Sequence, residues 1–569
     1  MSNRRQGLAL IMVLVVVAML SLSAYTFSSL MLAENESAIL HGKQLQSRAA
    51  VDSGVAHARY FLEQDVLTRE DLGGTYYNPE MFQAQLVVDN SEAKGRVRFA
   101  VLAPELSTDG YWGGMRFGLE DESSRLNLNA LDLEVPDFLG EDLGGALSGG
   151  LDEAAEAGGA PGGGSGPSGD SSGGGESNDD GNNSESGEEE EEVDTSGRGL
   201  LMQLPGMTVD IADAILDWID EDDDSREYGA EIDYYSSLPQ PYAPKNGPLE
   251  TLEELLLVRG VTPDLLFGRD QNRNGLIDLQ EQQLLIIDDD GSGELDRGWS
   301  SYLTLYSMEK NVSSDGMPRI DLNGDDLALL FEELTAVLGE PWATFIIAYR
   351  QFGPYKTPSR GEEEVETEPA GNQPLDFSKS GRVPITQVLD LIGVQVRAEL
   401  DGDEEPVILE SPFPDQPFAY SSYLPKLMDY CTVVPDTIIP GRVNINLAPF
   451  VVLTTIPGVT APIANDIIAE RDIDNSEFDP DFQHETWLLS RSIITLDEMR
   501  EMMPYVTAGG DVYRAQIVGY FDEGEIASRS EVIFDATSAA PRILFWRDIS
   551  HLGRGYPVEL LGVDLTNSE

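Results

Sequence analysis

The chain has 569 residues, 41% of them hydrophobic, and a formal net charge of −66 at pH 7. This length has room for two or three domains, and such strong acidity excludes a head that binds nucleic acid or an anionic membrane surface through its charge. The single cysteine, Cys431, cannot form a disulfide within the chain. The fold therefore depends on its hydrophobic cores or on bound metal.

The first residues predict a membrane anchor. Arg4 and Arg5 belong to a short basic leader that ends at Gly7, and an uncharged apolar segment follows from residue 8 to residue 32. At a rise of about 1.5 Å per residue, a helix of this length can cross a hydrocarbon layer of about 30 Å. The basic flank places the N-terminus in the cytoplasm and the rest of the chain across the membrane.

The helical pattern continues beyond the membrane segment. Between residues 33 and 64, small and apolar side chains recur at helical spacing without a proline. One helix is therefore predicted from Leu8 to about Gln64, with an apolar first half and an amphipathic second half. Strand patterns follow at 84–88, 96–102, 115–118, 512–521, 531–536 and 542–548. These strands predict an antiparallel sheet packed on the exposed half of the helix.

Two acidic stretches are predicted to be loops. Residues 144–196 are almost all Gly, Ser, Asp, Glu and Asn, so they cannot bury enough apolar surface to offset their chain entropy. We interpret the wider stretch 132–198 as a disordered loop. Residues 357–373 are also acidic and contain proline and glycine, and we interpret them in the same way.

Glycine turns join short helical patterns at Gly206 and Gly458, each preceded by a proline. Such turns are typical of helix-hairpin-helix units, some of which hold a DNA phosphate with turn amides and basic side chains. Acidic residues outnumber basic ones around both turns. The sequence therefore favours packing over phosphate binding.

A calcium loop is the most specific motif in the chain. Oxygen donors occupy positions one, three, five, nine and twelve of an EF-hand pattern, and a glycine at position six permits its sharp turn. Position seven adds a backbone carbonyl. The expected ligands are Asp270, Asn272, Asn274, Leu276, Asp278 and Glu281. Hard oxygen donors of this kind suit Ca²⁺.

A second loop with the same spacing begins at Asp288. Its donors would be Asp288, Asp290, Ser292 and Asp296, but position twelve is Trp299, which cannot bind a metal. We therefore expect a weaker metal site there.

No arrangement typical of an enzyme is evident in the sequence. The four histidines lie far apart, two of them on the predicted stalk helix. The chain lacks a phosphate-binding glycine loop, a nucleophile elbow and a Cys-His pair. The sequence predicts that this protein is not an enzyme.

The order of these features resembles a known family. A leader that ends in glycine, an apolar stalk and a globular head are similar to the type IV pilins and pseudopilins, whose leader is removed by a prepilin peptidase. Met12 stands where that class usually has glutamate, and the K-type minor pseudopilins of type II secretion share this difference. Further segments resemble general secretion pathway protein K: Ser124–Leu131, Leu204–Asp220, Tyr234–Asn246, Pro248–Thr262 and Arg442–Pro449.

The resemblance implies an α+β fold. A pilin-like long N-terminal helix would pack on an antiparallel sheet, into which a large α-helical domain of helix-hairpin-helix or SAM-like type is inserted. The implied segments are the leader at 1–7, the membrane span at 8–32, the exposed helix at 33–64, the first part of the sheet at 65–125, the insertion at 126–471, and the C-terminal part completing the sheet at 472–569. The insertion would contain the acidic loop 132–198 and the EF-hand-like region 269–300.

The resemblance also implies cleavage between Gly7 and Leu8, methylation, and a single-pass inner-membrane protein with its head in the periplasm. Its partners would be the I- and J-type minor pseudopilins in a tip complex, the major pseudopilin and the prepilin peptidase, but no nucleic acid. Its function would be to start or cap the pseudopilus that exports folded proteins across the outer membrane. Three alternatives stay open: a type IV pilus minor tip pilin, a membrane-anchored helix-hairpin-helix DNA-uptake protein, and a calcium-regulated envelope enzyme.

Overall fold

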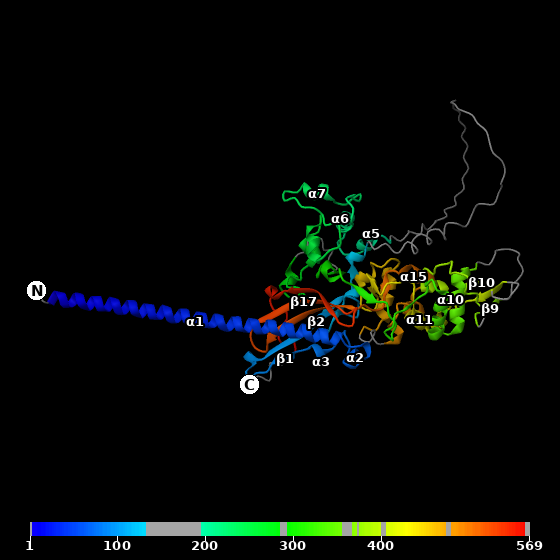
Figure 1. The fold of residues 1–569 in the computed structure, drawn as a ribbon. Helices are drawn as coiled ribbons and strands as arrows, with labels where there is room; N and C mark the ends of the chain where they lie inside the picture. The colour runs from blue at the N-terminus through cyan, green and yellow to red at the C-terminus, as the bar shows by residue number, and fades with distance from the viewer. Residues whose placement is uncertain are drawn as a thin grey trace, which may run out of the picture. The chain divides into compact units, whose positions relative to one another are not determined.

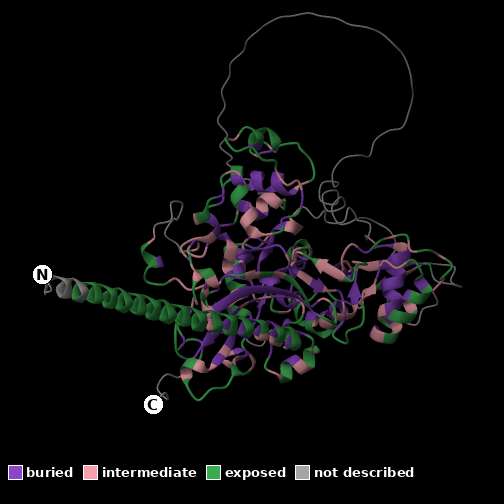
Figure 2. Cartoon of the chain, turned by 60° about the vertical axis from the view of Figure 1, so that its left-hand side comes forward, coloured by how far each residue is buried: buried purple, intermediate pink, exposed green. Residues whose placement is uncertain are grey.

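A long helix, α1 (Asn3–Leu62), runs from the N-terminus onto the sheet of the head (Figure 1). The computed structural model describes residues 3–131, 195–284, 293–355, 367–371, 375–399, 406–473 and 479–563, with side chains from residue 10 onward. By length and composition, α1 is the one helix among them that is able to cross a membrane. From residue 10 to residue 46 its side chains are exposed or half-buried, and burial begins at Ser47 (Figure 2). The predicted stalk helix is confirmed.

A seven-stranded antiparallel sheet packs against the second half of α1. Its strand order is β1-β2-β16-β17-β18, with β3 paired to β2 and β4 paired to β16. The central pair, β2 and β16, joins the two ends of the chain in antiparallel register. The strands are β1 (Gln85–Val88), β2 (Val97–Leu106), β3 (Trp112–Phe117), β4 (Glu120–Asp121), β16 (Val512–Phe521), β17 (Ala527–Asp535) and β18 (Arg542–Asp548). The predicted antiparallel sheet is therefore confirmed.

Glycines bring α1 unusually close to the sheet. A Cβ atom on Gly54 of α1 would lie 2.5 Å from Cγ2 of Ile517. A Cβ atom on Gly519 of β16 would lie 2.1 Å from the carbonyl oxygen of Ser47. Around this approach, one hydrophobic core joins α1 to β2, β16 and β17. Glycine is required at these two positions because an added Cβ atom would overlap atoms that are already packed there.

A second hydrophobic core lies in the region between β4 and β16. Its helices are α5 (Gly197–Leu201), α6 (Val209–Ile219), α7 (Ile232–Ser236), α8 (Pro263–Phe267), α9 (Leu327–Leu338), α10 (Glu340–Phe352), α11 (Pro417–Tyr430), α12 (Phe450–Leu453), α13 (Ala461–Glu470), α14 (Trp487–Ser490) and α15 (Leu496–Met502). The helical region is thus an insertion in the sheet. Two short helices, α2 (Val66–Asp71) and α3 (Pro79–Phe82), lie before β1.

Short strand pairs connect parts of the insertion. They are β5 (Leu126–Asn127) with β6 (Leu303–Thr304), β7 (Met308–Lys310) with β13 (Ile438–Pro440), β8 (Ile320–Asp321) with β12 (Cys431–Thr432), and β14 (Val443–Asn444) with β15 (Val506–Thr507). A three-stranded sheet adds β9 (Thr367–Pro369), β10 (Gln395–Ala398) and β11 (Val407–Glu410).

Some boundaries differ from the sequence prediction. The acidic loop was predicted to extend to residue 198, but α5 begins at Gly197, where the side chain of Ser196 accepts a hydrogen bond from the Gly199 N–H at 3.3 Å. Residues 132–194 lie outside the described residues. The second predicted loop contains β9, which pairs in parallel with β11. Two helices, α14 and α15, still follow residue 471, and the sheet resumes at Val512.

The close approach of α1 and β16 generates a testable prediction. Gly519→Ala should destabilise the head by about 1–3 kcal/mol, because the new methyl group meets backbone atoms of α1 that cannot move aside independently. Thermal unfolding of the full chain in detergent measures this loss. Gly509→Ala is the matched control, since nothing lies within 4 Å of its Cβ position. Equal melting temperatures for the two variants would contradict the prediction.

Candidate metal centre

The predicted calcium loop follows α8 directly and folds around the side chain of Asp270. One carboxylate oxygen, Oδ1, accepts a hydrogen bond from the Asn274 N–H at 3.0 Å. The other, Oδ2, accepts from the Gly275 N–H at 2.7 Å. Gly275 has a φ of +73°, so position six makes the left-handed turn that the motif requires.

The side chain of Glu281 closes the loop from its other end. Its Oε1 accepts from the Asn272 N–H at 3.3 Å and its Oε2 from the Asp278 N–H at 3.0 Å. Asp278 Oδ1 accepts from the N–H groups of Gln280 and Glu281. Asp270 and Glu281 are only 6% and 5% exposed. The structure therefore brings positions one and twelve of the motif into one buried loop.

The loop concentrates oxygen donors, and the guanidinium groups of Arg297 and Arg529 lie close enough to Asp270 to interact with its charge. Burial raises the pKa of Asp270, and the neighbouring Glu281 carboxylate raises it further, although two backbone N–H groups oppose this. Oδ1 of Asn272 is buried without a hydrogen-bond partner. Across the described residues, no three His, Cys, Asp or Glu side chains form a metal-sized cluster, and the loop carboxylates accept hydrogen bonds from backbone N–H groups.

The second predicted loop lies mostly outside the described residues, which exclude Asp288, Asp290 and Ser292. Asp296 is described, and its Oδ1 lies 3.2 Å from NH1 of Arg269 in an ion pair. Its backbone carbonyl accepts from the N–H groups of Arg269 and Asp270 at 2.7 and 3.3 Å. In the structure, Asp296 supports the start of the first loop.

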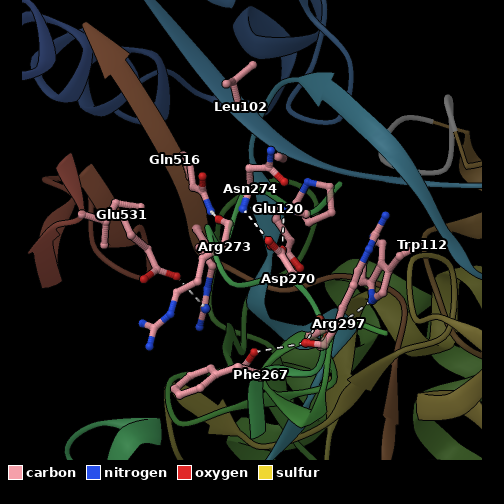
Figure 3. Close-up of a pocket in the computed structure, with 18 of the residues that line it drawn as sticks. Leu102, Trp112, Glu120, Phe267, Asp270, Arg273, Asn274, Arg297, Gln516 and Glu531 are labelled. Atoms are coloured by element: carbon pink, nitrogen blue, oxygen red, sulfur yellow. Dashed lines mark hydrogen bonds and ion pairs between the residues drawn. The ribbon is translucent and has the colours of Figure 1, made fainter. Parts of the chain in front are cut away.

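Backbone carbonyls of the calcium loop are held by the sheet, which sequence reasoning did not predict. Nε2 of Gln516, from β16, donates to the Arg273 carbonyl at 2.6 Å (Figure 3). The guanidinium of Arg529, from β17, donates to the Asn272 carbonyl. The hydroxyl of Tyr556 donates to the Asn274 carbonyl at 2.8 Å. Backbone acceptors leave no residue signature, so only long-range geometry reveals this docking.

Ion pairs between buried or half-buried side chains join the insertion to the sheet beside the loop. Glu253 precedes α8 and pairs with Arg273 of the loop at 2.8 Å. It also pairs with Arg547 of β18, which lies 2.5 Å from Glu531 of β17. Glu531 pairs in turn with Arg514 of β16 at 3.0 Å. These side chains line a cavity of about 110 Å³ next to Asp270 (Figure 3).

The remaining predicted features are positioned as follows. Gly7 and Leu8 lie within α1, with side chains outside the described set, so cleavage between them stays a prediction. Gly206 lies between α5 and α6, and its φ is +69°. Gly458 lies between α12 and α13, and its φ is +80°. Asp213 on α6 is buried and paired with Arg198.

Comparisons with known proteins identify the region before the loop. The family model described as type II secretion system (T2SS), protein K matches residues 124–267. This segment is therefore similar to protein K of type II secretion. The recognition of a protein K-like chain is confirmed over that segment, which runs from η2 (Glu122–Ser124) to the end of α8.

Other comparisons add little sequence similarity. A chain from the crystal structure of the GspK-GspI-GspJ complex of the enterotoxigenic Escherichia coli type 2 secretion system is similar at 9% identity, with a TM-score of 0.34. The alignment covers 90% of this chain and 99% of that chain. No curated protein matches the sequence. The protein K match ends at residue 267, and the predicted calcium loop begins at Asp270.

The ion pairs between insertion and sheet predict a pH-dependent stability. Burial alone would raise the pKa of Glu531, but the guanidinium groups of Arg514 and Arg547 lower it to about 2. Glu531→Gln should therefore destabilise the fold by about 3–5 kcal/mol at pH 7. The lowered pKa means that the fold is stabilised by the ionised form of Glu531 only. The difference in unfolding free energy between Glu531→Gln and the unmodified chain should therefore shrink as pH falls from about 4.5 to about 2.

Denaturant unfolding of the full chain in detergent at several pH values measures this difference. Glu523→Gln is the control, because Glu523 forms an exposed ion pair with Lys94 at 3.3 Å and should contribute at most about 1 kcal/mol. A loss in Glu531→Gln that is as small as in the control, or that is independent of pH, would refute the prediction.

Proposed function

We propose that this chain is a minor pseudopilin at the tip of the type II secretion pseudopilus, where it starts or caps filament assembly. The protein K match at residues 124–267 is the observation that carries the proposal. It occurs in a chain whose apolar α1 packs on an antiparallel sheet, the architecture that an anchored filament subunit needs. The proposed role is assembly, not catalysis.

The anchor residues support a position at the tip. Met12 stands where pilins usually have a glutamate that neutralises the N-terminal amine of a neighbouring subunit, and its side chain is 62% exposed on α1. A thioether cannot neutralise an amine. The chain would therefore enter the filament first, because no subunit already below it would then present an amine to neutralise.

The proposed partners and location follow from the same role. The I- and J-type minor pseudopilins would join this chain in the tip complex, above the major pseudopilin. The prepilin peptidase would cut between Gly7 and Leu8. The apolar part of α1 would anchor the chain in the inner membrane, with the sheet and the insertion in the periplasm.

A tip position predicts a low copy number. Quantitative mass spectrometry of sheared filaments should find this chain at one or a few copies per filament, far below the major pseudopilin. Deleting the gene should reduce the number of filaments because initiation is lost. Abundance comparable to the major subunit would place the chain in the shaft and contradict the proposal.

We further propose that the loop at 270–281 binds Ca²⁺. The ligands would be the side chains of Asp270, Asn272, Asn274, Asp278 and Glu281 with the Leu276 carbonyl. Two observations support this: the buried and unpartnered Oδ1 of Asn272, and the binding of the buried Asp270 and Glu281 carboxylates to backbone N–H groups of the same loop. Bound calcium would be coordinated by the buried Oδ1 of Asn272, which has no other partner. Asp278 and Glu281 would turn from backbone N–H groups toward the ion.

Calcium should raise the melting temperature of chelator-treated full chain in detergent. EF-hand modules outside cells bind Ca²⁺ with dissociation constants of about 0.1–1 mM. An excess of about a hundredfold stabilises the folded form by about 2.7 kcal/mol. Glu281→Gln keeps the side-chain volume but removes the closing carboxylate, so it should abolish most of the rise.

Asp315→Asn is the control for this experiment. Asp315 lies outside the loop, where its carboxylate accepts a hydrogen bond from Tyr430. This variant should keep the full calcium response. An unchanged melting temperature in the unmodified chain, or an undiminished rise in Glu281→Gln, would disprove calcium binding at this loop.

A further inference from the structure

The end of the described chain is attached to the calcium loop. We define residues 553–563 as the C-terminal strap. The Tyr556 hydroxyl of the strap donates to the Asn274 carbonyl at 2.8 Å, and the Asn274 side-chain amide donates to the carbonyl of Gly555. Asn274 thus holds the strap through two hydrogen bonds, while its Oδ1 is directed into the loop and accepts from the Leu276 N–H.

The strap continues from the loop onto the core between the sheet and α1. Tyr556, Val558 and Leu561 belong to the hydrophobic core of the sheet, and Leu561 is 0% exposed. The Tyr520 hydroxyl of β16 donates to the Leu561 carbonyl at 3.0 Å. The strap therefore contacts the calcium loop at one end and the core beneath α1 at the other.

A buried arginine of the sheet depends on the loop for a hydrogen-bond acceptor. Arg529 of β17 is 0% exposed, and no described residue forms an ion pair with it. Its side chain donates to the Asn272 carbonyl and lies over the Tyr556 ring at 6.0 Å from the ring centroid. If the loop opened, the guanidinium would lose its hydrogen-bond acceptor, which is costly for a buried charge.

We propose that a divalent cation in the loop orders the C-terminal strap and thereby couples the insertion to the pilin-like sheet. This inference rests on the proposed calcium site and adds its consequence. A ligand that favours the closed loop also favours every contact made only by that loop, here those from Gln516, Arg529 and Tyr556. The cation acts as a conformational lock between two parts of the head.

Hydrogen exchange of the full chain in detergent, with Ca²⁺ or with chelator, tests the coupling. Calcium should slow exchange in peptides from the loop and also in peptides from the strap. Tyr556→Phe keeps the ring but removes the hydroxyl bond to the Asn274 carbonyl. The loop should still gain protection, whereas the calcium-dependent protection of the strap should fall about fivefold, the equivalent of one hydrogen bond of about 1 kcal/mol.

Two further variants complete the design. Tyr423→Phe is the matched control, because the Tyr423 hydroxyl donates to the Pro414 carbonyl in the insertion, so the strap response should persist. Gln516→Ala removes the bond to the Arg273 carbonyl and should also weaken the coupling, which keeps the test valid if Tyr556→Phe does not fold.

The outcomes separate the two proposals. Calcium protection of the loop without protection of the strap would overturn the coupling and leave the calcium site intact. A strap response that is unchanged in both Tyr556→Phe and Gln516→Ala would also overturn it. If calcium protects neither the loop nor the strap, the calcium site itself fails, and the coupling fails with it.

Discussion

The backbone approach between α1 and β16 is the constraint on which the head depends. Gly519 lets the strand lie against the helix backbone at Ser47, and Gly54 of the helix leaves room for the side chains of Ile517 and Phe99. The core below them includes β2 from the start of the chain and β16 from near its end. Because those two strands pair directly, the insertion must leave the sheet after β4 and return to it at β16. The packing of α1 on the sheet therefore also fixes where the insertion is attached.

At the junction between insertion and sheet, carboxylates are paired with arginines, although the chain as a whole is strongly acidic. With a net charge of −66, most carboxylates repel one another, yet Glu253 and Glu531 are enclosed by arginines. Such buried pairs gain little net energy but penalise any other arrangement, since a separated partner leaves an unpaired buried charge. The calcium loop lies beside these pairs and shares Arg273 with them.

Local patterns predicted much of this structure. The uninterrupted helical spacing up to residue 64 predicted α1, and alternating apolar residues predicted the outer and central strands. The EF-hand spacing correctly predicted the turn at Gly275, whereas metal binding by Glu281 stays a prediction. Each of these signals is contained within a few consecutive residues.

Long-range contacts could not be predicted in this way. The parallel pairing of β9 with β11 lies in a stretch whose composition indicated only a loop. The docking of Gln516, Arg529 and Tyr556 on the calcium loop uses backbone carbonyls, which every residue has. The start of α5 at Gly197 depends on the Ser196 cap and on packing of Leu200 and Leu201, which outweigh the low helix propensity of glycine.

An experimental structure of the full chain in millimolar calcium, with anomalous diffraction to locate the metal, tests the central claim most directly. The account predicts one calcium ion about 2.3–2.6 Å from oxygens of Asp270, Asn272, Asn274, Asp278, Glu281 and the Leu276 carbonyl. It also predicts that Tyr556 still donates to the Asn274 carbonyl. A loop that holds no metal, with Asp278 and Glu281 still bound to backbone N–H groups, would contradict the account.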